Sequence, residues 1–354
     1  MTLTELSYYS RKAIPVLIIF CLFILIIFFL FKLVYLLAKS SEKPKNLYLN
    51  PIFNKISKPI IKETTTSAGF NFTLDTVEGV PITATETAKV YFLPKTTPKF
   101  GYREKIYLIA KNFGFNPDVD RYQLIDNQAV FKNEDKELII DIANFNFSYK
   151  KDLEDLTPEQ LSTSNLFIPF KKEIETQAAD FLNKVGRYPE ELIKGTNRII
   201  YLRYDQEKDS FINVKDKKQA NLVEIDFFRQ AVDNVEFVSP RFFTSQNYLI
   251  FLFKENNDYE MIKGQISFFE KSDNQIGVYP VKTGDQAWNE LKEGKAMVVS
   301  ARIGVKDIII KSMKLYYLDP DVYQSYLQPV YVFYDDKDFI AYVPAISNEF
   351  LVED

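Results

Sequence analysis

The sequence predicts an α+β protein with an N-terminal transmembrane helix followed by tandem units, each a helix packed on an antiparallel sheet. Three observations predict this. Residues 13–31 form an unbroken run of nineteen uncharged, mostly apolar residues. The rest of the chain is rich in residues that favour sheets, since the sequence holds 31 Phe and 22 Tyr. Three segments with helical spacing each end at a glycine and are followed by strand patterns.

The apolar run resumes after Lys32 and extends to residue 38, so we predict a transmembrane helix over residues 13–38. At about 1.5 Å per residue, nineteen residues span about 28 Å, which matches the hydrocarbon core of a bilayer. Lys32 lies near the end of the span, where its ammonium can reach the headgroups. A cleaved signal peptide is the alternative, but the bulky Leu36 stands where cleavage needs a small residue. The lipid bilayer is therefore the first expected partner.

The charges that flank the span leave its orientation ambiguous. Arg11 and Lys12 precede the span, whereas Lys39, Lys43 and Lys45 follow it. Long domains, however, cross a membrane largely regardless of such charges. We expect residues 1–12 to be a cytoplasmic tail and the large domain to lie outside the cytoplasm, in a single-pass protein of the cell membrane held by a signal anchor.

After the span, residues 39–66 are rich in Pro, Lys and Thr and are predicted to be a linker. The first α+β domain is predicted over 67–152, with a helix at 101–113, and the second unit over 157–278, with a helix at 170–186. Period-two patterns place strands before and after these helices. The strands are predicted at 70–74, 90–93, 122–125, 129–132, 138–149, 198–204, 220–227, 248–253 and 259–270.

The third unit, residues 279–354, has the clearest helix signal. Thr283 and Gln286 form a capping box that begins a helix at 283–293, and Gly294 ends it. Strands are predicted at 306–318, 328–334 and 339–346, and the polar turn 335–338 joins the last two into a hairpin.

Four segments of this third unit occur in a characteristic order: QAWNEL at 286–291, KLYY at 314–317, LQPVYVF at 327–333 and IAYVPA at 340–345. In this order they resemble the C-terminal unit of the YycH/YycI family and of the wider PepSY-like group. The resemblance implies a bacterial protein with one N-terminal span and an extracytoplasmic α+β module. It also implies regulation of a partner, such as a sensor kinase or a protease, without catalysis, so no catalytic residue and no cofactor follow from it.

Composition excludes several kinds of chemistry. The chain has no histidine, and its only cysteine, Cys21, lies in the apolar run, which excludes histidine-based triads, the usual zinc sites and intramolecular disulfides. A net charge of −4 does not indicate a nucleic-acid surface. Short matches to the S-x-x-K, S-D-N and K-T-G motifs lie in the wrong structural context for a penicillin-binding protein. Aspartates near prolines and turns are expected to cap backbone amides rather than to bind a cation.

The partner surface is predicted in the third unit, around the loop 319–328 between two strands. Tyr323 and Tyr326 are spaced to present two rings from this loop, and the predicted contact set also includes Tyr316, Asp319 and Asp321.

The main functional hypothesis is a non-catalytic, membrane-anchored extracytoplasmic protein that binds and regulates an envelope partner. The first alternative is a structural envelope scaffold or homo-oligomer, and the second is a carboxylate-based hydrolase of cell-wall polymers. A broad exposed apolar face would favour regulation, a self-complementary edge strand the scaffold, and a deep cleft with two opposed carboxylates the hydrolase.

Overall fold

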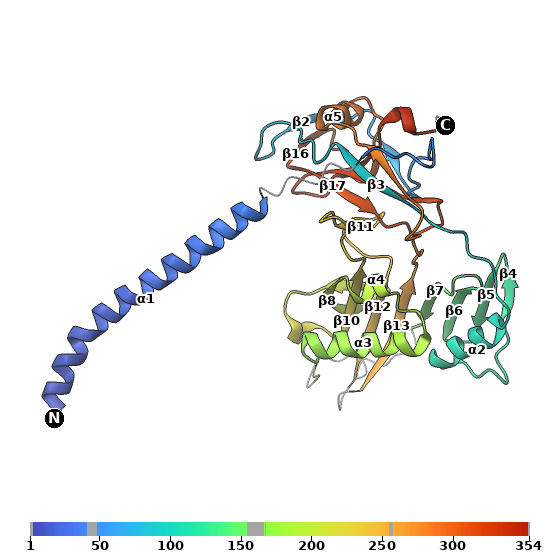
Figure 1. Cartoon of the computed structure of the whole chain (residues 1–354). Helices are drawn as coiled ribbons and strands as arrows, with labels where there is room; N and C mark the ends of the chain where they lie inside the picture. The colour runs from blue at the N-terminus through green and yellow to red at the C-terminus, as the bar shows by residue number, and fades with distance from the viewer. Residues whose placement is uncertain (1–2, 41–47, 154–165, 167, 255–257, 353–354) are drawn as a thin grey trace. The chain divides into compact units, whose positions relative to one another are not determined.

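The computed structural model describes residues 3–40, 48–153, 166, 168–254 and 258–352, and the chain divides into two units, residues 1–47 and 48–354. The first unit contains helix α1 (Leu3–Ser40), whose side chains are described at Ile14, Leu17 and residues 19–35. Within the part of the chain that is described, no helix combines the length and the apolar character that crossing a membrane requires. The second unit is an α+β body that is mostly sheet (Figure 1).

A nine-stranded antiparallel sheet forms one half of this body. Helices α2 (Tyr102–Asn112) and α3 (Lys171–Val185) lie on the same face of it, and the short α4 (Glu190–Ile193) follows α3 (Figure 1). The strands, in spatial order, are β4 (Gln123–Ile125), β5 (Gln128–Lys132), β6 (Lys136–Asp141), β7 (Phe147–Lys151), β13 (Tyr259–Ile266), β12 (Tyr248–Phe253), β10 (Leu222–Phe228), β8 (Thr196–Asp205) and β9 (Ser210–Asn213).

The apolar stripe of α3 shows why the helices cover that face. Its buried residues are Ile174, Ala178, Leu182 and Val185, at the spacing of one helical face, and they join the largest core cluster together with inward side chains of the sheet. Gly186 ends α3 at φ 70°, a conformation that glycine adopts without steric cost.

A second sheet of six strands forms the other half of the body, and helix α5 (Gly284–Lys292) packs against its core through Ala287 and Leu291. Five of its strands are antiparallel to their neighbours, and β11 pairs in parallel with β17. The spatial order is β1 (Thr65–Thr66), β15 (Met297–Ser300), β20 (Ile340–Pro344), β19 (Pro329–Tyr334), β17 (Ser312–Leu318) and β11 (Phe237–Val238).

Two small sheets complete this half. One has the order β14 (Ile276–Pro280), β3 (Thr87–Phe92) and β18 (Tyr326–Leu327). The other is a parallel pair of β16 (Asp307–Ile310) and β2 (Asn71–Leu74).

The α+β class, the three helices and the final hairpin are confirmed, but the strands do not form three separate repeats. Strand β7, predicted in the unit 67–152, pairs with β13, predicted in the unit 157–278, so these units share one sheet. Strands β1, β2 and β3, all before residue 93, pair with strands after residue 275. The predicted boundaries therefore do not separate the sheets, because a strand pattern does not identify its partner.

The predicted linker 39–66 is wrong over its second half. Asn50 forms a bridge with Val278, Ile56 is fully buried and pairs with Leu351, and Thr65 and Thr66 form an edge strand. This segment is held by the body because its scattered apolar residues find places in the core, which a composition rich in Pro and Lys does not reveal.

Candidate functional site

The predicted loop 319–328 is largely an internal segment. The hydroxyl of Tyr323 donates a 3.0 Å hydrogen bond to the carbonyl oxygen of Leu93. The ring of Tyr326 lies 5.1 Å from that of Phe53, and Tyr326 belongs to β18, which pairs with β3. Both rings that were expected to be presented from this loop therefore also make contacts inside the body. Tyr323 remains 37% exposed, and its contact with a partner stays a prediction.

The other predicted contact residues also have internal roles. Tyr316 lies on β17, half-buried beside Phe242, and burial raises its pKa to about 12. Asp319 is only 4% exposed, so its predicted role on an open partner surface is wrong. Asp321 is half-buried, and its backbone carbonyl accepts a 2.8 Å hydrogen bond from the Ser267 hydroxyl.

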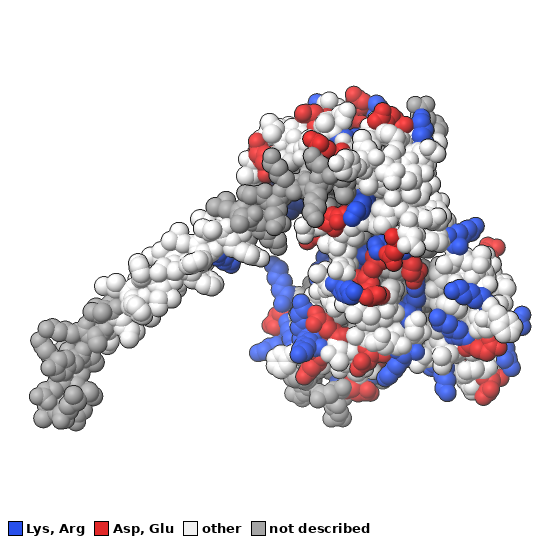
Figure 2. Space-filling view, in the orientation of Figure 1, with Lys and Arg blue, Asp and Glu red and all other residues white. Residues whose placement is uncertain are grey.

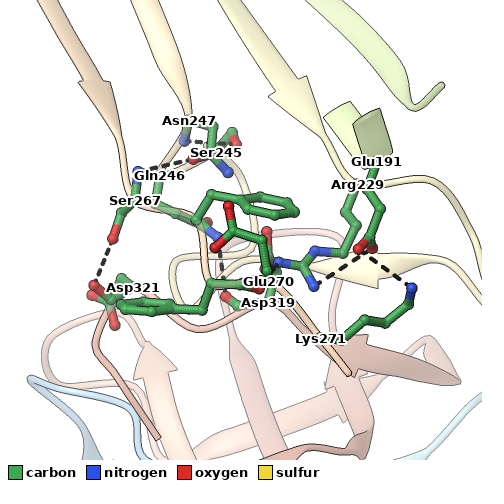
Figure 3. A network of polar contacts seen from close by, with 12 residues as sticks. Glu191, Arg229, Ser245, Gln246, Asn247, Ser267, Glu270, Lys271, Asp319 and Asp321 are labelled. Atoms are coloured by element: carbon green, nitrogen blue, oxygen red, sulfur yellow. Dashed lines mark hydrogen bonds and ion pairs between the residues drawn. The ribbon is translucent and has the colours of Figure 1, made fainter. Parts of the chain in front are cut away.

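A buried charge cluster surrounds Asp319 (Figure 3). Atom Nη2 of Arg229 lies 3.2 Å from Oδ1 of Asp319, and Nη1 lies 3.6 Å from Oε2 of Glu191. The guanidinium also stacks on Phe268, with 4.0 Å between Cζ and the ring centroid. Burial raises the pKa of Asp319 to about 6, although the charge of Arg229 opposes this shift. The Asp319 side chain is thus a carboxylate at neutral pH that gains a proton in mild acid.

Polar side chains extend this cluster across the joint between the two large sheets. The amide of Gln246 donates a 3.2 Å hydrogen bond to the carbonyl of Asp319, while Asn247 accepts one of 2.9 Å from the amide of Ser267 (Figure 3). Because the donors and acceptors come from both the nine-stranded sheet and the C-terminal loop, the cluster fixes one sheet against the other. We name the residues Glu191, Arg229, Gln246, Asn247, Ser267, Asp319 and Asp321 the polar joint.

A second pair of carboxyl groups lies on β10, on the face of the nine-stranded sheet opposite α2 and α3. Asp226 is fully buried, and its Oδ2 accepts a 3.1 Å hydrogen bond from Nε of Arg198. Burial, the charge of Asp226 and a hydrogen bond to it raise the pKa of Glu224 to about 7. Glu224 therefore gains a proton near neutral pH. Glycosidase carboxylates stand about 5 Å or more apart with the substrate or water between them, whereas Asp226 is fully buried, so this pair does not match the hydrolase alternative.

A surface groove of about 360 Å³ lies in the C-terminal half of the body. Three segments line it: the loop before β16, the strand β16 itself and the turn between β19 and β20. Its lining residues are Arg302, Val305, Asp307, Ile308, Ile309, Lys311, Asp335, Asp336, Lys337 and Phe339. The groove lies within the third unit, residues 279–354, where the partner surface was predicted, but on different segments from the loop 319–328. We name it the β16 groove.

Strand β16 has one paired edge and one free edge. The amide of Asn71 donates a hydrogen bond to the carbonyl of Lys306, and the amide of Asp75 donates one to the carbonyl of Ile310. The backbone amides and carbonyls of the even-numbered residues 306, 308 and 310 therefore point towards β2. Asp307 and Ile309 point their backbone groups the other way. Within the described part of the chain, these two residues have no backbone hydrogen-bond partner.

Sequence reasoning missed both the β16 groove and the polar joint. The pattern at 306–318 predicted one strand, whereas the chain divides at Lys311 into β16 and β17, which pair with different neighbours. Arg229 follows two phenylalanines at the end of β10, and nothing local marks it as the centre of a buried cluster.

In the described residues, no group of three or more Asp, Glu, Cys or His side chains is arranged to hold a metal ion.

No family model matches the sequence, and no curated protein matches it. Among solved structures, the chain is similar to an uncharacterized protein from Eubacterium rectale, with 12% identity and a TM-score of 0.35. The alignment covers 78% of this chain and 89% of that one. At this identity and TM-score, the similarity carries no argument about function.

Proposed function

We propose that this chain is a membrane-anchored protein whose α+β body lies outside the cytoplasm and binds and regulates another envelope protein without catalysis. The observation that carries the proposal is the surface of α1. Every described side chain from 19 to 35 is exposed, and nearly all are Ile, Leu, Phe or Val, interrupted by Cys21, Lys32 and Tyr35. A helix that is apolar all round needs lipid or protein to cover it.

The length of the apolar sequence favours lipid as that cover. The uncharged run begins at Ala13, before the continuously described side chains begin at Ile19, and continues to Phe31. Nineteen residues of helix span about 28 Å, close to the hydrocarbon thickness of a bilayer. The described part of α1 is nearly free of charge, whereas charged side chains of both signs are scattered over the visible face of the body (Figure 2).

The β16 groove supports the binding part of the proposal. It joins exposed apolar side chains, Val305 and Ile309, to three cations and three aspartates on one concave surface. Such a mixture of apolar anchors and polar rim is typical of surfaces that bind proteins. Regulation without catalysis is the expectation raised by the resemblance of the third unit to the YycH/YycI and PepSY-like proteins.

The topology is tested by adding protease to spheroplasts of cells that produce the protein. We expect the body to be digested while a fragment containing α1 stays in the membrane. Full protection of the body would contradict the proposed orientation, and a mature protein beginning near residue 39 would contradict the anchor.

The binding role is tested by placing a photo-crosslinking amino acid at Val305, on the groove, and at Val77 as a control. Val77 is fully exposed and lies outside the lining of the groove. We expect a discrete crosslinked envelope protein from position 305 and none from position 77. Equal products from both positions, or none from position 305, would remove the groove as the binding surface.

A further inference from the structure

Resting on the proposed function, we infer that the β16 groove binds an extended segment of the partner, which adds a strand to the free edge of β16. The occupant is a peptide segment that ends or turns away at Lys311, rather than a folded surface or a second copy of this chain. The inference depends on the backbone of β16 first, and then on the shape of the groove.

The free edge of β16 offers the hydrogen bonds that an added strand needs. Asp307 and Ile309 each present an amide and a carbonyl that no described backbone group pairs, and both residues line the groove. Another extended backbone can satisfy donors and acceptors that alternate along a strand edge. Side chains of the partner would alternate between the groove and the solvent.

The opposite wall of the groove does not compete for this edge. The turn after β19 satisfies its own amides, because Oδ1 of Asp335 accepts hydrogen bonds from the amides of Lys337, Asp338 and Phe339 at 2.7–2.8 Å. Aspartate at the start of a turn commonly plays this role. The turn is therefore a closed unit that faces β16 without pairing with it.

The end of β19 limits how far an added strand can run. The amide of Lys311 already bonds the carbonyl of Tyr334, so β19 occupies the edge directly beyond Ile309. A second copy that paired its own β16 here in parallel would bring its β17 against β19, because Lys311 alone separates β16 from β17. A segment that ends or turns at this point avoids the collision.

The side chains add an apolar contact rather than a net charge. Ile309 is 50% exposed, and it lines the groove together with Val305 and Phe339. The charges in the lining balance, with Arg302, Lys311 and Lys337 against three aspartates. An apolar side chain of the partner is thus the expected anchor, and the backbone supplies the rest of the recognition.

The test uses the full chain in lipid nanodiscs and phage-displayed random peptides as the probe. Enriched peptides are measured for affinity against the parent, Ile309→Pro and Ile309→Ala. Proline removes the free amide and blocks the edge, whereas alanine keeps the edge and removes only the side chain. We expect Ile309→Pro to weaken binding about tenfold or more, because backbone hydrogen bonds are lost, and Ile309→Ala to weaken it less.

A second measurement guards against unfolding of the proline variant. The amide of Ile309 has no hydrogen-bond partner among the described residues, so we expect an unchanged melting temperature. In the parent protein, bound peptide should slow hydrogen exchange in residues 305–311. Unslowed exchange there, equal binding to Ile309→Pro, or a failure to enrich any peptide would overturn strand addition. A concentration-dependent dimer that Ile309→Pro abolishes would assign the edge to a second copy and would also overturn it.

Failure of this inference is distinguishable from failure of the proposed function. If Ile309→Pro still gives the crosslinked envelope protein from position 305 in cells, the binding role stands and strand addition is wrong. If the parent gives no such product, the binding role itself is wrong.

Discussion

At the scale of single residues, the buried carboxyl groups make stability depend on pH. The pKa of Asp319 is raised by burial from 3.8 to about 6, so the folded state holds its proton more tightly than the unfolded state. Stability from this proton is fully present below pH 3.8 and is lost as the pH rises through 6. Two pKa units correspond to about 3 kcal/mol.

In the parent, we therefore expect the free energy of unfolding to fall by about 2–3 kcal/mol between pH 4 and 6.5 because of Asp319. The Asp319→Asn variant should lack this fall. Urea unfolding of the parent and the variant at several pH values measures this. Asp336→Asn, at an exposed position of the turn, is the control and should keep the parental profile. If Asp319→Asn also keeps that profile, Asp319 does not titrate as argued.

The Glu224 and Asp226 pair predicts a second loss of stability at higher pH. Burial and the neighbouring Asp226 raise the pKa of Glu224 from 4.5 to about 7, so stability falls as the pH rises through 7. Glutamine at position 224 can still donate a hydrogen bond to Asp226 without carrying a charge. We expect Glu224→Gln to be about 1–3 kcal/mol more stable than the parent at pH 8, with a smaller gain at pH 5.

Thermal unfolding at the two pH values tests this second prediction, with Glu137→Gln as the control. The side chain of Glu137 lies on the same face of the nine-stranded sheet as that of Glu224, but it is 44% exposed. A Glu224→Gln variant that loses stability at pH 8 would show that the charged form of Glu224 is the favoured one.

The role of a single residue can be predicted from the sequence when its interaction partner is only a few positions away along the chain. The capping box of Thr283 and Gln286 was predictable because both partners lie within one turn, and the structure contains it. Asp319 looked like a turn residue because Pro320 follows it, yet its partner Arg229 lies far away in the sequence. No local pattern reports such a pairing.

At the scale of elements, close approach between strands decides which glycines are replaceable. Gly195 lies between α4 and β8, and a Cβ atom there would come within 1.8 Å of the backbone oxygen of Phe228. Phe228 ends β10 opposite Thr196, the first residue of β8. The backbone must shift to admit any side chain, which would separate the two strands at this end.

We expect Gly195→Ala to lower the free energy of unfolding by about 2 kcal/mol or more. Gly264→Ala is the matched control, because the nearest atom to its Cβ is the flexible end of Leu249, which can move aside. Urea unfolding of both variants measures the difference. If Gly195→Ala lowers the free energy of unfolding no more than Gly264→Ala does, the ends of β8 and β10 can separate without loss of stability.

The helices were predictable at this scale and the sheets were not. Each helix carries its own apolar stripe within eleven to fifteen residues or a complete capping box, as in α2, α3 and α5. A strand instead depends on neighbours from elsewhere in the chain. Strand β3 illustrates this, because it pairs with β14 and β18, both more than 180 residues later. The free edge of β16 follows from the same long-range pairing and was equally hidden.

At the scale of the whole molecule, the division after residue 47 predicts two separable behaviours. Among the described residues, the sheets and the core clusters all lie in the body, residues 48–354, and no described side chain of α1 belongs to them. The apolar helix should therefore determine membrane association alone. The body should fold without it, since none of the described core side chains lies in residues 1–47.

The last prediction compares the full chain with a version beginning at residue 48, using flotation with liposomes and urea unfolding. We expect the full chain to float and the shortened chain to stay in the dense fraction, with similar unfolding midpoints for the body. A matched full-length variant, Leu25→Lys with Phe28→Arg, should float poorly, because each charge costs about 3 kcal/mol near the centre of a bilayer. Flotation of the shortened chain would place a membrane-binding surface on the body, and its unfolding would show that the first 47 residues are part of the fold.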